Sequence, residues 1–545
     1  MTDEESSNSL LVQLKKSTNK WRLAFLCFVI AYAITLIINL TNQPIQWDEV
    51  AHLNGGSFLY WANYEKFMAN SFYPPLLDFL TYLSFKVLGV SLFAARLIPV
   101  LFSMLALWTV FELACRMYDG KTGLLAAVLL GVMPGYYWLS SLALLETMLV
   151  FFTAAAVLFF YLWLTSHKDR YMLFTGLAMG FGLMTKYQMI VTAIVIIVGI
   201  LFLARKQLKF AFKKFILIVA AAAAIVVPWI IVAYEVYADK LLSQWIYALQ
   251  VGNPERSIYS GRFPAPIFYL IEMVWPYDVF HPVSIFVYAA GLAGLAFLVW
   301  RRRPQDKLVF IWFACIFVFF TLITNKEWRY VLPLFPALAI AASAGFMSAY
   351  EGLSSAAKKA AAVANKRRLL KAASVLLVAS MAGAVAYSVY DTCFYVSALQ
   401  INIPIEQATN YAYQNIGANK SIIVLCPFNL FSRDMVRFYL WADGDNLIPV
   451  FQYPRQPVDA YTPNFNITEF ISICKQLNVQ YVFTYENGGT VPYYNTTLNL
   501  QQIYMQLYAS GNFTHISDNA TFGANPRRIF ILEYIGNLQN RTPAG

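Results

Sequence analysis

The sequence is poor in charged residues and in cysteine. Only 13% of its 545 residues are charged, whereas 59% are hydrophobic, a balance too apolar for a soluble globular protein. The six cysteines show neither paired spacing nor a metal-ligand pattern, so the sequence encodes no zinc site and no disulfide framework by pattern. The composition therefore indicates a polytopic membrane protein.

Two further features that the sequence lacks reduce the number of possible functions. The interiors of the apolar segments hold almost no ionisable residue, which argues against an ion- or proton-coupled transporter, because such proteins place carboxylates near the bilayer midplane. No Gly-rich phosphate-binding loop occurs either, so no nucleotide site is indicated. The net charge of +11 comes from basic residues in short loops, a pattern typical of topology signals rather than of nucleic-acid binding.

Long apolar segments dominate residues 22–396, which we predict to be the transmembrane domain. A span needs about 20 apolar residues. Segments 51–70 and 74–90 are apolar but interrupted, which favours amphipathic helices at the membrane interface, and the number of passes between 234 and 283 stays open, giving about 11 to 13 spans. The eleven candidate spans are 22–40, 91–114, 122–141, 143–165, 171–185, 187–204, 212–234, 283–300, 308–324, 329–350 and 372–396.

Lysine and arginine cluster in alternate loops, which predicts the orientation. The N-terminus, residues 1–21, is expected in the cytoplasm, and its basic residues precede an apolar run without a small-residue cleavage site, so we expect no cleaved signal peptide. The loop 41–90 and the tail 397–545 are then extracytoplasmic.

The tail becomes polar and carries strand-like runs, which predicts a small α/β domain. The strands are expected at Ser421–Leu425, Val479–Tyr485 and Arg528–Tyr534. Asn-x-Ser/Thr triplets concentrate in this segment, which fits its extracytoplasmic placement. The candidate N-glycosylation sites are Asn419, Asn466, Asn495, Asn512, Asn519 and Asn540.

The stretch from Gln46 to His52 places Asp48, Glu49 and His52 where the first span leaves the membrane. Carboxylates and an imidazole at such a boundary are suited to proton transfer, although charges at this place also mark an ordinary membrane interface. Other ionisable residues fall on the same predicted face. An enzyme on that face lacks cytosolic nucleotide donors, whereas a group carried on a lipid phosphate is available. The basic residues predicted to hold that phosphate are Lys186, Arg256, Arg262, Lys326 and Arg329.

Six short motifs, spread over about residues 22–347, together resemble the membrane-embedded GT-C glycosyltransferases. The resemblance is to the family that includes dolichyl-phosphate-mannose protein mannosyltransferases and the bacterial lipid A aminoarabinose transferase. The motifs are Trp47-Asp48-Glu49, Tyr73-Pro74-Pro75-Leu76, Arg96-Leu97-Ile98-Pro99, Leu145-Glu146-Thr147, Thr185-Lys186 and the segment Arg329–Pro336. The chain departs from the family at Tyr73, where members often carry Lys or His, and at Phe72, which replaces an acidic residue of the aminoarabinose enzyme. Neither that phosphate contact nor a metal ion like that of the aminoarabinose enzyme is therefore carried over.

The resemblance implies transfer of a single sugar from a polyprenyl- or dolichyl-phosphate donor to a protein or lipid-linked acceptor. We predict that Asp48 is the base, with inversion at the anomeric carbon, and that Glu49 is a second catalytic residue. His52, Tyr73 and Glu146 are expected to support the site. No definite cofactor is implied, and a divalent metal ion stays open. The alternatives are an oligosaccharyltransferase-like enzyme, and a non-enzymatic receptor or transporter with a glycosylated ectodomain.

Overall fold

The computed structural model forms two compact units. The helical unit comprises residues 1–39, 72–77 and 97–399, and the mixed unit comprises residues 40–71, 78–96 and 400–545. The residues that the structure describes are 3–70, 73–238, 243, 261–275, 281–360, 363–399, 403–425, 431–442, 444, 447–453, 465–485, 500–516, 521–523 and 528–536.

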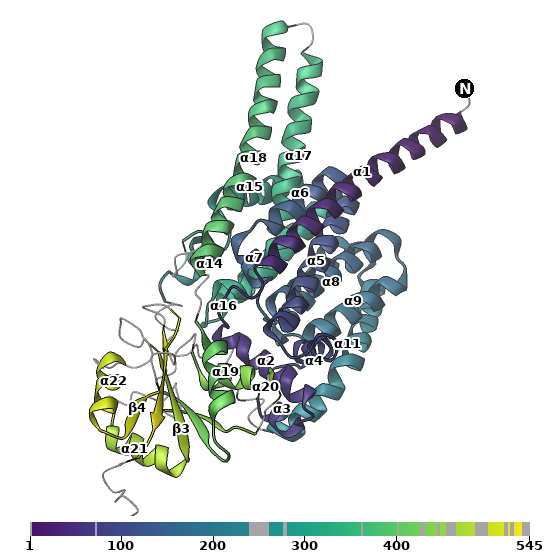
Figure 1. Ribbon diagram of the computed structural model, residues 1–545. Helices are drawn as coiled ribbons and strands as arrows, with labels where there is room; N and C mark the ends of the chain where they lie inside the picture. Colours follow the sequence, from purple (N-terminus) through teal and green to yellow (C-terminus); the bar gives the residue numbers. More distant parts are fainter. Residues whose placement is uncertain are drawn as a thin grey trace, which may run out of the picture. The chain divides into compact units, whose positions relative to one another are not determined.

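Apolar helices make up the helical unit (Figure 1). They are α1 (Asp3–Ile38), α5 (Leu92–Met117, which enters the unit after Arg96), α6 (Gly120–Gly131), α7 (Pro134–Leu139), α8 (Glu146–Ser166), α9 (Asp169–Leu183), α10 (Ile190–Leu203), α11 (Leu208–Tyr237), α14 (Phe268–Glu272), α15 (Ile285–Arg301), α16 (Pro304–Leu322), α17 (Phe335–Lys359) and α18 (Ala364–Leu399). Short 3₁₀ helices η1 (Tyr187–Met189), η2 (Arg205–Gln207), η3 (Ala265–Ile267) and η4 (Trp328–Leu334) connect some of them.

Among the described residues, seven helices are long and apolar enough to cross a membrane. Three shorter apolar helices, Gly120–Gly131, Tyr187–Leu203 and Ile285–Arg301, accompany them. All eleven predicted apolar segments contain helix, but the segment 122–141 is divided into α6 and α7. The break falls before Pro134, which begins α7, because proline lacks the N–H that a continuous helix requires there. The prediction of a multi-pass integral membrane protein is confirmed.

Glycines allow several of these helices to approach closely. Gly294 of α15 lies against the backbone of Ala341 in α17, where a Cβ atom would overlap the Ala341 carbonyl. Small residues at such contacts favour helix association in membranes, since packing rather than water exclusion drives it. The α15–α17 contact therefore depends on the missing side chain.

The mixed unit contains a six-stranded sheet with strand order β2-β1-β3-β6-β4, and β5 pairs with β6. Its elements are α2 (Trp47–Tyr60), α3 (Tyr64–Asn70), α4 (Leu76–Leu88, from Asp78 onward), α19 (Ile405–Asn415), β1 (Ser421–Leu425), α20 (Arg433–Ala442), β2 (Val450–Tyr453), α21 (Ile467–Gln476), β3 (Val479–Tyr485), α22 (Leu500–Ala509), β4 (Phe513–His515), β5 (Thr521–Phe522) and β6 (Ile529–Tyr534). Strand β1 is parallel to β2 and β3, whereas β6 is antiparallel to β3.

The three predicted strands correspond to β1, β3 and β6. Every residue of β1 is buried, as expected for a parallel strand that is covered on both faces. Helices α21 and α22 cover one face through residues such as Phe470 and Leu507, and Figure 1 shows both helices beside the strands. The predicted fold class, a polytopic helical domain with a C-terminal α/β domain, is confirmed.

We expect Gly294→Ala to lower the free energy of unfolding of the protein by about 1–3 kcal/mol, because the added methyl group overpacks the α15–α17 contact. Gly383→Ala on α18 is the matched control, since a Cβ atom there meets no atom within 4 Å. Thermal unfolding of both variants in detergent is the measurement. Equal midpoints for the two variants would contradict the close-approach role of Gly294.

Candidate active site

Helix α2 begins at the candidate catalytic segment. Gln46 is its extended N-cap residue, and the backbone N–H of Gln46 donates to Oε2 of Glu49 at 3.1 Å. Asp48 and Glu49 both lie in the first turn, where the helix dipole stabilises negative charge. The sequence thus starts a helix and concentrates two carboxylates at its positive end.

Glu49 forms a fully buried ion pair with Arg96 at the start of α5. Nε and Nη2 of Arg96 donate to the two carboxylate oxygens of Glu49, each at 2.7 Å, and neither side chain is exposed to solvent. Nη1 donates to the carbonyls of Leu40 and Gln43 at 2.8 and 3.0 Å, and Nη2 also donates to the Pro44 carbonyl at 3.1 Å. One guanidinium therefore joins α5, the first turn of α2 and the loop that precedes it.

Asp48 and Glu49 have different environments although they are adjacent. Asp48 is half-buried, whereas Glu49 is buried. Neighbouring positions on a helix point about 100° apart, so only one of the two faces Arg96. The predicted pair therefore consists of one carboxylate held in an ion pair and one that retains access to solvent.

His52 lies one turn after Asp48 and contacts Asp78 of α4. The distance from His52 Nδ1 to Asp78 Oδ1 is 2.7 Å, and both side chains are buried. Burial raises the pKa of Asp78, and the neighbouring His52 opposes that shift. Gly55 lets this carboxylate approach, because a Cβ atom on Gly55 would overlap Asp78. The contact between His52 and Asp78 thus connects α2 with α4.

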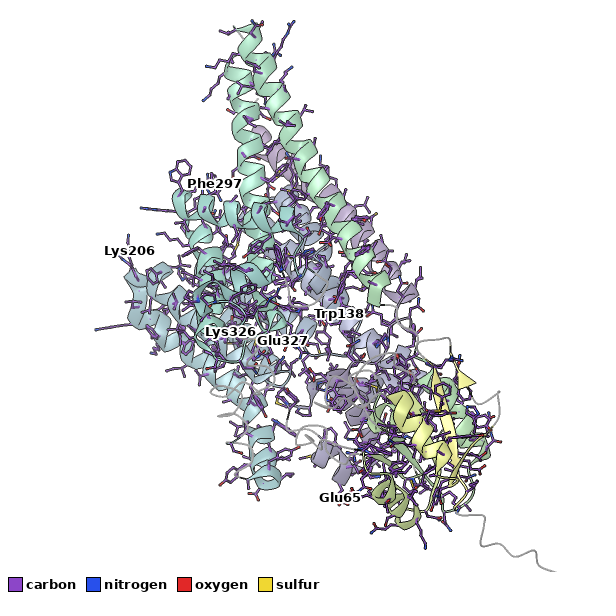
Figure 2. The ribbon with its side chains drawn as sticks, turned by 90° about the vertical axis from the view of Figure 1, so that its left-hand side faces the viewer. Glu65, Trp138, Lys206, Phe297, Lys326 and Glu327 are labelled. Carbon is purple, nitrogen blue, oxygen red and sulfur yellow. The ribbon has the colours of Figure 1, made fainter. Side chains whose placement is uncertain are left out.

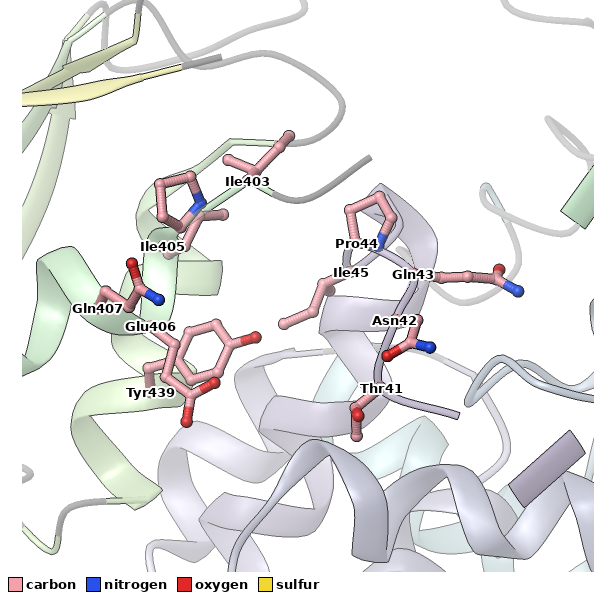
Figure 3. Close-up of a pocket in the computed structure, with 11 residues that line it drawn as sticks. Thr41, Asn42, Gln43, Pro44, Ile45, Ile403, Ile405, Glu406, Gln407 and Tyr439 are labelled. Carbon is pink, nitrogen blue, oxygen red and sulfur yellow. The ribbon is translucent and has the colours of Figure 1, made fainter. Parts of the chain in front are cut away.

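A polar cavity of about 100 Å³ lies in the mixed unit, lined by the loop Thr41–Ile45, by Ile403–Gln407 and by Tyr439. Figure 3 shows Ile45 and Tyr439 pointing toward one another across it, with Glu406 and Gln407 on the side of Tyr439. Burial, followed by the charge of Glu406, raises the pKa of Tyr439. Its hydroxyl therefore stays protonated at neutral pH and presents a hydrogen-bond donor.

The helical unit holds a second charged cluster, built from three helix starts. Nζ of Lys186, directly before η1, lies 3.0 Å from Oε1 of Glu146, the first residue of α8. Arg329 of η4 lies 3.9 Å from the same oxygen and 2.5 Å from Oε1 of Glu327. The structure thus brings together Glu146, Lys186 and Arg329, which are far apart in the sequence.

The segment that begins at Tyr73 belongs to the same cluster. The N–H of Leu76 donates to the carbonyl of Met184 at 3.1 Å, and Tyr73 acts electrostatically on Lys186. Burial by itself lowers the pKa of Lys186, but the carboxylate of Glu146 and the neighbouring tyrosines raise it, and the net shift is upward. Lys186 is therefore a cation at neutral pH.

The other predicted phosphate-binding cations have surroundings that differ from those of Lys186 and Arg329. Lys326 lies beside Glu327 (Figure 2), and its ammonium donates to the Ile323 carbonyl. Burial lowers the pKa of Lys326. Arg262 stacks on Phe263, with 4.9 Å from its guanidinium carbon to the ring centroid. Arg256 lies outside the described residues.

Three of the candidate glycosylation sites lie in the described part of the chain. Asn419 has a left-handed backbone conformation, Asn466 caps α21, and Asn512 precedes β4. The sites Asn495, Asn519 and Asn540 lie outside the described residues. Within the described ranges, no group of three or more His, Cys, Asp or Glu side chains is arranged to hold a metal ion.

Two contributors to these clusters were not predicted as site residues from the sequence. In the sequence, Arg96 is the first residue of one of the six motifs, near the start of an apolar span, and Asp78 is an acid near the start of an amphipathic helix. A charge at such a position indicates a buried partner, because an unpaired one is costly. Their partners become evident only once α2, α4 and α5 are placed.

The architecture is that of the GT-C membrane glycosyltransferases. The chain is similar to ArnT from Cupriavidus metallidurans in the apo state, with a TM-score of 0.64, 14% identity and coverage of 94% of this chain and 98% of that one. The same protein bound to undecaprenyl phosphate gives a TM-score of 0.59. It is also similar to the oligosaccharyltransferase AglB from Archaeoglobus fulgidus in complex with an inhibitory peptide and a dolichol-phosphate, with a TM-score of 0.56, 14% identity and coverage of 93% and 74%.

Sequence comparison gives the same relationship. The family described as dolichyl-phosphate-mannose-protein mannosyltransferase matches residues 73–232. The undecaprenyl phosphate-alpha-4-amino-4-deoxy-L-arabinose arabinosyl transferase of Erwinia tasmaniensis is 29% identical over 318 residues, which are 55% of this chain and 54% of that protein. The chain spans about half the length of the curated relatives it matches. The predicted resemblance to this group of glycosyltransferases is confirmed.

We expect Arg96→Lys to destabilise the protein by about 3–5 kcal/mol, since an ammonium cannot replace the two-point contact with Glu49 and also serve three carbonyls. Arg368→Lys on the exposed part of α18 is the control and should leave stability unchanged. Chemical denaturation of the full-length protein in detergent, followed through its intrinsic tryptophan fluorescence, measures the effect. Similar stability of the two variants would show that the buried pair is dispensable.

Proposed function

We propose that the protein transfers a single sugar from a polyprenyl-phosphate donor to a hydroxyl acceptor. The observation that carries the proposal is the cluster of Lys186 and Arg329 around one carboxylate, Glu146, at the starts of apolar helices. The fold shared with a protein solved with undecaprenyl phosphate supports it. An apolar helix surface accommodates a lipid tail, and two adjacent cations suit a phosphate.

Lys186 and Arg329 are the groups we propose for holding the donor phosphate. Glu146 and Glu327 contact these cations and hold them in position before the lipid binds. When the bond between the anomeric carbon and the phosphate oxygen breaks, negative charge grows on the phosphate. Fixed cations stabilise that charge more than they stabilise the bound donor, which lowers the barrier. Arg256, Arg262 and Lys326 remain candidates for the same role.

Asp48 is the proposed general base. It removes the proton of the acceptor hydroxyl while that oxygen attacks the anomeric carbon, and the lipid phosphate leaves with the bonding electron pair. A single displacement of this kind inverts the anomeric configuration. Glu49, held by Arg96, and His52, held by Asp78, position helix α2 and therefore Asp48.

The family description and the names of the relatives indicate different sugars. The family description names mannose, whereas the relatives' names specify 4-amino-4-deoxy-L-arabinose. We propose a hexosyl, mannosyl-type transfer to a protein or lipid-linked acceptor, in which the polar tail 397–545 helps to select the acceptor. The reaction is proposed to take place on the extracytoplasmic face, with the N-terminus in the cytoplasm and glycans on the tail.

Oligosaccharide transfer is the second candidate, and the similarity in fold to AglB supports it. The two reactions differ in whether the product carries one sugar or a whole glycan. A non-enzymatic receptor is the third reading, and it predicts that Asp48 and Arg329 are replaceable without a functional loss. Mass analysis of the product separates the first two from each other, and a turnover assay separates both from the third.

We expect Asp48→Asn to reduce turnover by about 10²–10⁴-fold while leaving stability unchanged, because a neutral amide cannot accept the proton. Purified protein is incubated with radiolabelled polyprenyl-phosphate-mannose, -glucose or -aminoarabinose, and lipid and protein fractions are counted separately. Asp169→Asn, at the start of α9, is the control substitution. Full turnover by the Asp48 variant would exclude it as the base.

Lys186→Gln should raise the KM for the lipid donor and also lower kcat, because the lysine is proposed to contact the phosphate of the bound donor and to stabilise the charge that grows on it when the bond breaks. Because the pKa of Lys186 is raised, the ammonium of the wild-type protein should stay charged up to about pH 9. Its contribution to the KM for the lipid donor should therefore stay constant over that range. Lys206→Gln, at the periphery of the helical unit (Figure 2), is the control. An unchanged KM in the Lys186 variant would remove this residue from the donor site.

A further inference from the structure

A groove of about 740 Å³ lies between α17 and α18, and none of the residues assigned to the proposed reaction lines it. These two helices run side by side (Figure 1). Its lining includes Tyr350 and Lys358 from α17, and Arg367, Lys371 and Val375 from α18. The proposed transfer reaction uses none of these side chains, so the groove requires an explanation of its own.

The groove is basic at one end and apolar at the other. Arg367, Lys371 and Val375 follow one another at four-residue spacing on α18, which places them along one face of the helix. Tyr350 and Lys358 are eight residues apart on α17 and share a face in the same way. The step from Arg367 to Val375 covers about 12 Å along the helix. The polarity therefore changes over the length of a lipid headgroup.

The charge at the basic end is of one sign. The segment 358–371 contains six basic residues and no acidic one. Within the described part of the chain, none of Lys358, Arg367 and Lys371 has an ion-pair partner. Val375 and Val378 are 68% and 45% exposed. An anion with an attached apolar chain matches both ends of such a groove.

The lengths of the two helices place the basic end at the depth of lipid headgroups. Helices α17 and α18 are 25 and 36 residues long, or about 38 and 54 Å. The hydrocarbon core of a bilayer is about 30 Å thick. Both helices therefore extend beyond the core, and basic residues between transmembrane helices at this level attract anionic headgroups.

We propose that this groove binds one anionic phospholipid of the surrounding membrane. Its phosphate contacts Lys358, Arg367 and Lys371, and one of its acyl chains lies along Val375 and Val378. The site is separate from the two cations proposed for the donor phosphate, because Lys186 lies directly before η1 and Arg329 lies in η4, and neither lines the groove. The inference does not depend on the proposed sugar transfer.

The test measures lipid retention by native mass spectrometry. The full-length protein is reconstituted in nanodiscs of equal parts phosphatidylglycerol and phosphatidylcholine and then released. The variant Lys358→Gln/Arg367→Gln/Lys371→Gln is compared with Arg205→Gln/Lys206→Gln/Lys209→Gln, which removes three exposed basic residues at the loop between α10 and α11. The single variant Lys371→Gln is measured beside them, so that a folding defect of the triple variant does not decide the result.

The wild-type protein and the loop variant should retain one phosphatidylglycerol molecule, and the groove variant should bind it at least about tenfold more weakly. The single variant should fall between them. Equal retention in all variants, equal loss in the loop variant, or equal retention of phosphatidylcholine would overturn the proposal. So would displacement of the bound lipid by an equimolar polyprenyl phosphate, since the groove would then belong to the donor.

Discussion

The buried ion pair between Glu49 and Arg96 is the constraint on which the candidate catalytic segment depends. Removing two charges from water is costly, and their attraction offsets that cost only when the geometry is good and the remaining donors are satisfied. Here both carboxylate oxygens receive N–H groups, and the same guanidinium serves three carbonyls of the preceding loop. The pair therefore fixes where the chain enters α2, and with it the direction in which Asp48 points.

The cluster in the helical unit uses charge differently. Lys186 and Arg329 are partly buried cations that contact carboxylates at helix starts. The carboxylates reduce the cost of holding these cations at the edge of an apolar bundle. A phosphate in the proposed donor site would add negative charge where the cations are already oriented, so little reorganisation would accompany binding. The ion pairs of the two units thus differ in their consequences: the pair in the mixed unit orients a helix, and the pairs in the helical unit hold the cations of the proposed donor site.

The sequence predicted the regular elements well where one physical signal dominated. The apolar runs became helices, and the β-branched and aromatic runs at Ser421–Leu425 and Val479–Tyr485 became β1 and β3. The short strand Val450–Tyr453 was missed, because four residues carry too little periodicity to identify a strand. The break before Pro134 was also missed, although the proline signals it.

The site was predictable in its residue types but not in its pairings. The motifs identified Asp48, Glu49, Glu146, Lys186 and Arg329, yet the partners of these residues are more than 30 positions away in most cases. Which carboxylate contacts which cation depends on how the helices pack, and no local pattern contains that information. Arg96 and Asp78 show this clearly, because each is a single charge in an apolar context until its partner is placed.

The two adjacent carboxylates bear directly on the stereochemistry of the proposed reaction. A retaining mechanism needs a second carboxylate close to the first that is available to attack the anomeric carbon. Glu49 is the nearest in sequence, but both of its oxygens accept hydrogen bonds from Arg96 and its side chain is fully buried. Attack by Glu49 would break that pair and leave the charge of Arg96 buried without compensation. The buried pair therefore supports the proposal of a single displacement with Asp48 as the base and inversion at the anomeric carbon.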